Sequence, residues 1–270
     1  MYEHEATQGH LETLRRRGVH VVGPEAGRLA SGHTGLGRMS EVDTIIGALR
    51  YVLGRGGDLA GKKVVVSAGG TQEPIDPVRY VGNYSSGKMG YALAEAARDR
   101  GAETVLVSAP VALPAPYAVR VIPVRRAGEM RDAVVAECVE ADVLIMAAAV
   151  ADYQPAEAIG QKIKRQREGL SLSLVRTPDV LAEVGRRQGL VKVGFAAESE
   201  ELLANARQKL EQKGLDLIVA NDVTAEGSGF GTDTNRVVLL DSGGEEELPL
   251  MSKYDVAVRV LDRVAALVRG

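Results

Sequence analysis

The 270-residue sequence has one cysteine, Cys138, no tryptophan and two phenylalanines, and these shortages exclude several classes of protein. A single cysteine cannot form an internal disulfide or build a cysteine-rich zinc site. No run approaches the roughly 18 apolar residues of a membrane-spanning helix, and the first residues lack the apolar region of a signal peptide. Lys and Arg number 33 against 36 Asp and Glu, without the basic excess typical of duplex binding. We expect a cytoplasmic protein with no nucleic-acid and no membrane partner.

Histidine is absent from most of the chain, because all four histidines lie within the first 33 residues. Any catalysis beyond that point lacks the side chain that most often acts as a general base near neutral pH. It would depend on lysines, carboxylates, amides and backbone N–H groups. This favours nucleotide or phosphate chemistry, in which positioning and charge contribute most of the catalysis.

Residues 1–60 are predicted to form a small unit before the main domain. Their pattern predicts a helix, a short strand at 19–22, a glycine-rich stretch at 27–37 and a second helix over about 41–53. A polar, glycine-punctuated linker follows at 54–62. The unit is too small for a core of its own, so we expect it to pack on the rest of the chain or to be partly loose.

Residues 61–270 have the regular pattern of one α/β domain. Buried-strand runs are predicted at 64–68, 104–108, 119–124, 142–147, 191–195 and 215–220. Helices are predicted at about 88–100, 127–140, 178–187 (with Thr177 as N-cap and Pro178 at the first position), 200–213 and 253–268. Residues 236–250 read as a hairpin turning at 242–244. The expected fold is a Rossmann-like, doubly wound, mostly parallel sheet with an added β-hairpin and a short N-terminal helical arm.

Two glycine-containing stretches follow the first predicted strand, at the edge where such sheets bind ligands. Residues 69–79 read as a long loop with two prolines, a length that is often functional. Residues 82–90 match G-x-x-x-x-G-K, but Met89 stands where a P-loop needs Ser or Thr, so we reject a Walker A motif. Ser85, Ser86 and Gly87 offer backbone amides for an anion, although a plain helix cap is equally compatible.

Other strand ends carry weaker signals. Three alanines, 147–149, leave room for a ligand against the backbone, and Asp152 follows them. The run 161–167 holds four cations and is either a solvated face or a lid over a polyphosphate. Lys209 and Lys213 lie one helical turn apart, which fits either a phosphate site or simple solubility. Phe195 could stack on a base or belong to the core.

Together these stretches resemble the phosphopantothenate–cysteine ligase family of coenzyme A biosynthesis. The resemblance covers about 61–270 and rests on residues 69–80, 83–90, 147–153, 162–165, 194–198 and 220–223. In bacteria this ligase is usually the C-terminal half of a bifunctional flavoprotein, phosphopantothenoylcysteine decarboxylase/ligase. The resemblance implies that CTP and Mg²⁺ convert the carboxylate of 4′-phosphopantothenate into an acyl-cytidylate, which the amine of cysteine then attacks.

The same resemblance assigns roles to residues. Asn83, which contacts the intermediate, and Lys162, the lid lysine of the first half-reaction, are the expected catalytic residues; Asn83, Ala148 and Ala149 are the expected substrate contacts. With the anion candidates included, the expected nucleotide-binding residues are Ser85, Ser86, Gly87, Asp152, Lys162, Thr177, Pro178, Asp179, Val180, Phe195, Lys209 and Lys213. The metal ligands are not assigned. The family is dimeric, with the site at the subunit interface, so a homodimer is expected.

The first 39 residues resemble only the tail of the flavin decarboxylase. Ser31 stands in the loop that usually carries the decarboxylase's catalytic cysteine, and a serine hydroxyl is a far poorer acid than a thiol. We therefore expect no decarboxylase activity and no FMN in this chain. A separate flavin decarboxylase is a candidate partner.

Two other functions compete with the ligase. A Rossmann-type NAD(P)-dependent oxidoreductase is suggested by the fold alone, but G-x-G-x-x-G is missing after the first strand. The sequence also offers no clear Tyr-x-x-x-Lys pair on a helix, because Tyr80 and Lys88 are eight residues apart. A non-catalytic nucleotide-binding module would keep the site and lose turnover. ATP in place of CTP also stays open, because base choice depends on backbone contacts.

Overall fold

A computed structural model describes residues 1–164, 169–185, 187–198, 202–222, 227–229 and 231–269. The strands of its main sheet are β3 (Lys63–Ala68), β6 (Glu103–Ser108), β7 (Arg120–Pro123), β8 (Val143–Met146), β11 (Val191–Glu198), β12 (Leu217–Asp222), β13 (Thr234–Asp241) and β14 (Gly244–Ser252). Their order is β14-β13-β12-β11-β8-β3-β6-β7. The run from β12 to β7 is parallel, and β13 and β14 are added antiparallel. The predicted Rossmann-like fold with an added hairpin is confirmed.

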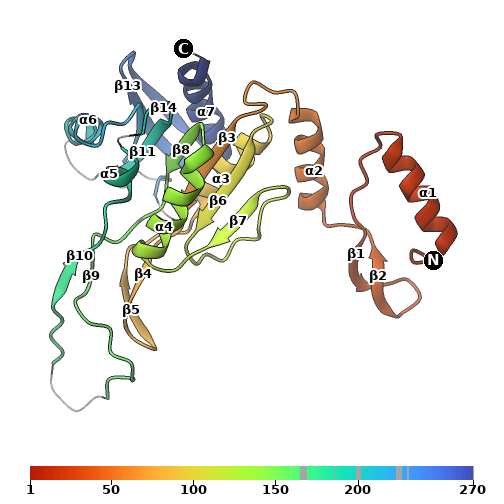
Figure 1. Cartoon of the computed structure of the whole chain (residues 1–270), viewed down its shortest axis with the longest axis horizontal. Helices are drawn as coiled ribbons and strands as arrows, with labels where there is room; N and C mark the ends of the chain where they lie inside the picture. Colours follow the sequence, from red (N-terminus) through yellow and green to blue (C-terminus); the bar gives the residue numbers. More distant parts are fainter. Residues whose placement is uncertain (165–168, 186, 199–201, 223–226, 230, 270) are drawn as a thin grey trace.

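Helices cover both faces of this sheet (Figure 1). Helices α3 (Lys88–Arg98) and α7 (Lys253–Arg269) pack on one face, and α4 (Ala127–Glu137), α5 (Val180–Val184) and α6 (Leu202–Lys213) on the other. A short 3-10 turn, η1 (Cys138–Glu140), extends α4. Because successive strand residues point to opposite faces, Val64 and Val66 join the core under α3 and α7, whereas Val65 joins the core under α4.

The chain reverses at the centre of the sheet, and this reversal places the site. From β3 it continues outward to β6 and β7, whereas from β8 it continues in the other direction to β11 and β12. The connections that leave the carboxyl ends of the neighbouring strands β3 and β8 therefore run in opposite directions across the sheet. Such a switch point is where doubly wound sheets bind ligands.

The expected loop at 69–79 is instead largely a hairpin, so that prediction is wrong. Strands β4 (Gln72–Asp76) and β5 (Arg79–Gly82) pair antiparallel. The Asp76 carboxylate accepts hydrogen bonds from the amides of Val78 (2.8 Å) and Arg79 (2.9 Å), and these bonds form the turn. A second ribbon, β9 (Tyr153–Pro155) with β10 (Leu174–Arg176), extends from the same end of the molecule (Figure 1).

The N-terminal unit contains α1 (Glu5–Arg16), β1 (Glu25–Arg28), β2 (Thr34–Arg38) and α2 (Val42–Gly54), and lies to one side of the sheet (Figure 1). The prediction of a strand at 19–22 is wrong, because these residues form no strand; β1 and β2 instead pair around the glycine-rich stretch. Helix α1 buries no residue, whereas α2 buries Gly47 and Ala48. A Cβ at Gly47 would lie 3.1 Å from Tyr117 Cβ, so a small residue permits this docking.

The helix predicted at 178–187 begins later than expected. Asp179, and not Thr177, is the N-cap of α5, and its carboxylate accepts from the amide of Ala182 (3.1 Å). The Thr177 hydroxyl donates instead to the carbonyl of Ala151 (2.6 Å). Within the described residues no helix is long and apolar enough to cross a membrane.

Candidate active site

Two adjoining cavities open at the carboxyl ends of the parallel strands. The first has a volume of about 570 Å³ and the second about 510 Å³. They share the wall residues Ala148, Val150, Asp152, Phe195 and Lys209, which come from the segment after β8, from β11 and from α6. The two cavities therefore form one continuous site beside the switch point.

Two buried hydroxyls anchor the part of the shared wall that follows β8. The amide of Ala148 donates to Ser67 Oγ at the end of β3 (3.1 Å), and the amide of Ala151 donates to Thr71 Oγ1 (2.9 Å). Ser67 and Thr71 are almost fully buried. These bonds satisfy backbone groups beyond the last residue of β8 and fix the loop that carries Asp152.

Most of the residues predicted to bind the nucleotide line the first cavity. They are Asp152, Thr177, Pro178, Asp179, Val180, Phe195, Lys209 and Lys213, with Ala148 from the predicted substrate set. Lys209 Nζ donates to the carbonyl of Phe195 (2.8 Å), and Lys213 forms an ion pair with Asp179. Burial alone would raise the pKa of Asp179, but Lys213 and the α5 amides outweigh it and hold that pKa below its ordinary value.

The remaining predicted residues, apart from Lys162, line the second cavity: Asn83, Ala149, Ser85, Ser86 and Gly87. Ala148 lines both cavities. Asn83 Nδ2 donates to the carbonyl of Val150 (3.1 Å), which connects the loop before α3 with the loop after β8. The amides of Gly87 and Lys88 face Ser85 Oγ (3.3 Å) and Ser86 Oγ (3.5 Å). The two serine hydroxyls thus accept from backbone amides where α3 begins. A ligand that binds these amides would replace only long hydrogen bonds.

Lys162 lies away from both cavities. It is exposed and is not among the residues that line either cavity. Its segment is bound to the β4–β5 hairpin, because the amide of Ile163 donates to Asp76 Oδ2 (3.2 Å) and that of Ile159 to the carbonyl of Ile75 (2.9 Å). Residues 165–167 of the basic run, together with Val223 and Phe230, lie outside the described residues.

Two lysines that the sequence argument did not assign are central to the second cavity. Lys88 and Lys253 are the first residues of α3 and α7, and both line this cavity. A cation at a helix N-terminus faces the positive end of the helix dipole and is unfavourable there. That unfavourable placement in two helices was the sequence signal that could have identified them. Arg176 and Asn235 also line the site without an equivalent signal.

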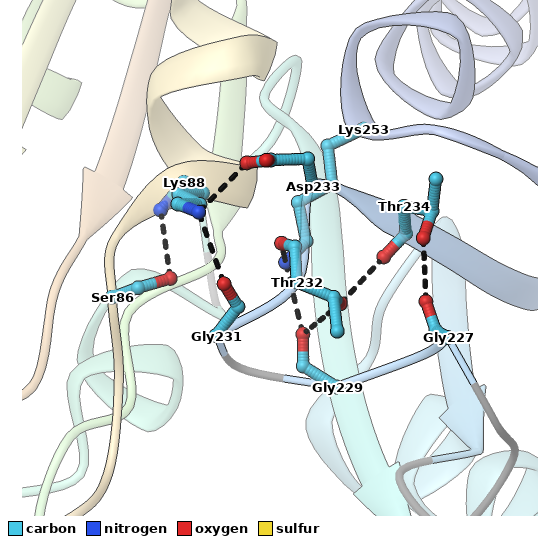
Figure 2. Close-up of polar contacts among 9 residues, drawn as sticks. All are labelled: Ser86, Lys88, Gly227, Gly229, Gly231, Thr232, Asp233, Thr234 and Lys253. Atoms are coloured by element: carbon cyan, nitrogen blue, oxygen red, sulfur yellow. Dashed lines mark hydrogen bonds and ion pairs between the residues drawn. The ribbon is translucent and has the colours of Figure 1, made fainter.

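Lys88 and Lys253 hold one glycine-rich loop between them (Figure 2). Lys88 Nζ donates to the carbonyl of Gly231 (3.0 Å) and to Asp233 (2.7 Å). Lys253 Nζ donates to the carbonyls of Gly229 (2.9 Å) and Thr232 (2.5 Å). Of these loop residues, Gly229 lines the second cavity, so Lys253 holds that part of the cavity wall in place.

The carboxylates of the site could hold a metal ion only if a bound ligand supplied further ligating atoms. No group of three His, Cys, Asp or Glu side chains that could hold a metal occurs among the described residues. Asp152 is an exposed carboxylate on the shared wall, whereas Asp179 is paired with Lys213. Mg²⁺ in proteins often binds through one or two carboxylates plus substrate phosphates, and Asp152 fits that arrangement.

Comparison with known proteins gives two family matches. Residues 59–268 match the family described as DNA/pantothenate metabolism flavoprotein C-terminal domain, and residues 1–54 match the family described as flavoprotein. The coenzyme A biosynthesis bifunctional protein CoaBC of Bacillus subtilis is 44% identical over 272 residues, covering 99% of this chain and 67% of that protein. A cysteine/cysteine sulfinic acid decarboxylase from an unknown prokaryotic organism is 42% identical over 276 residues, covering 99% and 77%.

A solved structure is also similar to this chain. The crystal structure of the C-terminal domain of a coenzyme A biosynthesis bifunctional protein CoaBC has a TM-score of 0.68 and 38% identity, and covers 78% of this chain and 98% of that one. The family match spans most of the chain, and the relatives are similar over nearly its full length. The chain belongs to the CoaBC family of coenzyme A biosynthesis proteins, with its main domain in the family of the DNA/pantothenate metabolism flavoprotein C-terminal domain.

Proposed function

We propose that this chain is a phosphopantothenate–cysteine ligase that uses CTP and Mg²⁺. One observation carries the proposal: eight of the residues expected to hold the nucleotide line one cavity, although they are spread in sequence from Asp152 to Lys213 and Lys162 is not among them. The residues expected to contact the acid, Asn83, Ala148 and Ala149, line the adjoining one. A two-step reaction with a shared intermediate needs this kind of adjacency.

In the proposed first step, a carboxylate oxygen of 4′-phosphopantothenate attacks the α-phosphorus of CTP, and the bond to the β-phosphate oxygen breaks. Pyrophosphate leaves with that electron pair, and an acyl-cytidylate remains. The barrier comes largely from bringing together negative charges, so cations matter more than a general base. Lys209 on the shared wall and Lys162, after movement of its segment, would supply positive charge; Asp152 would hold Mg²⁺.

In the second step, the amine of cysteine attacks the acyl carbon. A C–N bond forms, the C–O bond to the phosphate breaks, CMP leaves with the electron pair, and the amine proton passes to solvent. Asn83 can donate its amide N–H to the acyl oxygen without adding a charge. In this proposal, the Asn83 N–H group that donates to the Val150 carbonyl in the structure would donate to the substrate instead.

The N-terminal unit is proposed to be inactive as a decarboxylase, because Ser31 replaces the thiol that the reaction needs. No FMN is proposed for this chain. A homodimer, with a separate flavin decarboxylase as a further partner, is the proposed assembly.

The test is pyrophosphate release from purified protein with 4′-phosphopantothenate, Mg²⁺ and either CTP or ATP, first without cysteine and then with it. About one equivalent with CTP, followed by turnover on adding cysteine, is the expected result. Asn83→Asp and Lys162→Gln should abolish product while the protein stays folded; Lys164→Gln is the matched control for loss of a nearby exposed lysine.

Full activity of Asn83→Asp and Lys162→Gln would remove the mechanism. No release by folded wild-type protein would favour a non-catalytic nucleotide-binding module. NADH or NADPH binding, seen by nicotinamide fluorescence, would favour the oxidoreductase.

A further inference from the structure

The tip of the β4–β5 hairpin holds Ile163, the residue after Lys162, by both its N–H and its carbonyl. Asp76 Oδ2 accepts a hydrogen bond from the Ile163 amide (3.2 Å), and Arg79 Nη2 donates to the Ile163 carbonyl (3.4 Å). Asp76 and Arg79 are paired in the hairpin register and form an ion pair (3.3 Å). Asp76 and Ile163 are 87 positions apart in sequence, so only the folded hairpin brings them together.

A second bond fixes the same segment a few residues earlier. The amide of Ile159 donates to the carbonyl of Ile75 (2.9 Å), the residue before Asp76. Only residues 160–162 separate the two anchored positions, 159 and 163. The backbone of Lys162 is therefore tied to the hairpin on both sides.

The hairpin tip lies at a distance from the two cavities. Asn83, directly after β5, lines the second cavity, whereas no residue from 72 to 82 lines either cavity. Figure 1 shows β4 and β5 extending away from the main sheet. The strand from Arg79 to Asn83 spans about 13 Å at roughly 3.3 Å per residue. A lysine side chain extends only about 6 Å from its Cα. While Asp76 holds Ile163, Lys162 is therefore out of reach of Asn83.

The Asp76 carboxylate can release Ile163 without losing the turn. Asp76 is almost fully buried and accepts from three amides, those of Val78 (2.8 Å), Arg79 (2.9 Å) and Ile163 (3.2 Å). Burial would raise the pKa of Asp76, but these amides and the Arg79 charge outweigh it and keep that pKa below its ordinary value. Of the three bonds, the one to Ile163 is the longest and the one that leaves the hairpin, so it is the bond that movement of the Lys162 segment would break.

We propose that Asp76 is a positioning residue for Lys162: its bond to the Ile163 amide holds the lysine outside the site and breaks when the lysine joins the nucleotide. This inference rests on the proposed function, whose first step gives Lys162 its role. Because the complete complex needs the broken bond, the apparent affinity for CTP is reduced by the small fraction of molecules in which the segment is already free. The contact of Lys162 with a phosphate then compensates for the lost bond.

The test breaks this bond from either side in the full chain and measures how much CTP the first step needs. Asp76→Asn keeps an oxygen for the turn amides and places an NH₂ group against the Ile163 amide. Ile163→Pro removes the amide N–H and leaves Asp76 paired with Arg79, so it tests the proposal if Asp76→Asn does not fold. In single-turnover pyrophosphate release without cysteine, each variant should lower the CTP concentration for half-maximal release about tenfold, the effect of one lost hydrogen bond to a charged group. The later reaction with cysteine should be unchanged.

A second measurement separates this role from a structural one. By titration calorimetry, Asp76→Asn should tighten CTP binding when Lys162 is present. It should not tighten binding when combined with Lys162→Gln, because the glutamine brings no charge to the phosphates. General damage to the hairpin would weaken binding or leave it unchanged in both backgrounds.

Asp241→Asn is the matched control for Asp76→Asn. Asp241 lies beside the turn of the β13–β14 hairpin, accepts from the Gly243 amide (2.7 Å) and pairs with Arg263 (3.2 Å), but lines neither cavity. Ile163→Ala, which keeps the amide N–H, is the control for Ile163→Pro. Both controls should need the wild-type concentration of CTP.

An unchanged or higher CTP requirement in both Asp76→Asn and Ile163→Pro would overturn the proposal. Equal tightening with and without Lys162→Gln would also overturn it, because the segment would then act without its lysine. If the wild type releases pyrophosphate and neither variant shifts the CTP requirement, this inference alone is refuted; no release by the wild type refutes the proposed function as well.

Discussion

At the scale of single residues, Gly87 decides how α3 begins beside the second cavity. Its φ is +74°, and a Cβ there would lie 2.6 Å from Val111 Cγ1. Gly87→Ala should therefore lower the free energy of unfolding by about 2–3 kcal/mol, from left-handed backbone strain and overpacking together. Urea denaturation measures the change.

Gly214→Ala separates the two causes. Gly214 also has a positive φ, +57°, but no atom lies within 4 Å of the position that a Cβ would take there. It should cost only about 1–2 kcal/mol, the backbone contribution. An equal loss in both variants would mean that contact with Val111 contributes nothing.

Glu137 is expected to make stability depend on pH in the acid range. Its hydrogen bonds with Arg120 (2.8 and 2.5 Å), and then Lys63, lower its pKa to about 2 although burial opposes them. Because the folded pKa lies below the unfolded one, the stabilisation is complete above about pH 4.5 and is lost as pH falls towards 2. Glu137→Gln should cost about 1 kcal/mol at neutral pH, since Arg120 is half exposed.

Thermal unfolding at several pH values checks this expectation. The difference in stability between wild type and Glu137→Gln should narrow as the pH falls from 5 towards 2. A constant difference over that range would show that the carboxylate charge is not the cause. Asp132→Asn, which removes an exposed carboxylate paired with neighbouring Arg131, is the control and should have a smaller effect.

At the scale of elements, Asp76 connects the β4–β5 hairpin with the segment that carries Lys162. Asp76→Asn keeps one oxygen for the turn amides of Val78 and Arg79, but places an NH₂ group where Oδ2 accepts from Ile163. Hydrogen exchange at the Ile163 amide should become about tenfold faster, as expected for losing a hydrogen bond of roughly 1.5 kcal/mol to a charged group.

The Ile159 amide is an internal control, because it donates to the backbone carbonyl of Ile75 and not to Asp76. Its exchange should not change. In the wild type, backbone amides and Arg79 hold the pKa of Asp76 below its ordinary value against burial, so the same release is expected as pH falls through that lowered pKa. Equal acceleration at both amides would indicate that the whole hairpin unfolds.

The elements that the sequence predicted correctly are those with strong hydrophobic patterns. Strands β3, β6, β8 and β12 are runs of β-branched and aliphatic residues, and α3, α4 and α7 have one apolar face. The β4–β5 hairpin could not be found in this way, because Pro74, Pro77 and several polar residues hide its alternation. Its turn depends on Asp76, which also binds a segment distant in sequence.

At the scale of the whole molecule, the first 39 residues should be dispensable for folding of the rest. Helix α1 buries nothing, and β1 pairs only with β2 among the described strands. Removing 1–39 should shift the unfolding temperature of the remaining chain by only a few degrees, because it exposes little of the core. Differential scanning calorimetry measures the shift.

Gly47→Leu is the complementary variant in the full chain. Its side chain would collide with Tyr117, whose Cβ is 3.1 Å from the position of a Cβ at residue 47, and should separate α2 from the domain. We expect it to lower stability more than the deletion does. A larger loss from the deletion would show that the residues before α2, among them His20 with its hydrogen bond to the Tyr117 hydroxyl (2.9 Å), attach the unit more strongly than α2 does.

Local periodicity and the motifs at strand ends were sufficient to predict the doubly wound fold and to single out many of the residues that line the two cavities, because each of these features lies within a short stretch of chain. The meeting of Asn221, Asn235 and Lys253 in one cavity needed the folded molecule, because three separate elements must pack before these side chains approach each other. The same holds for Lys253 as a cation without a carboxylate partner among the described residues: burial and pairing depend on the positions of all neighbouring groups, which no stretch of sequence contains.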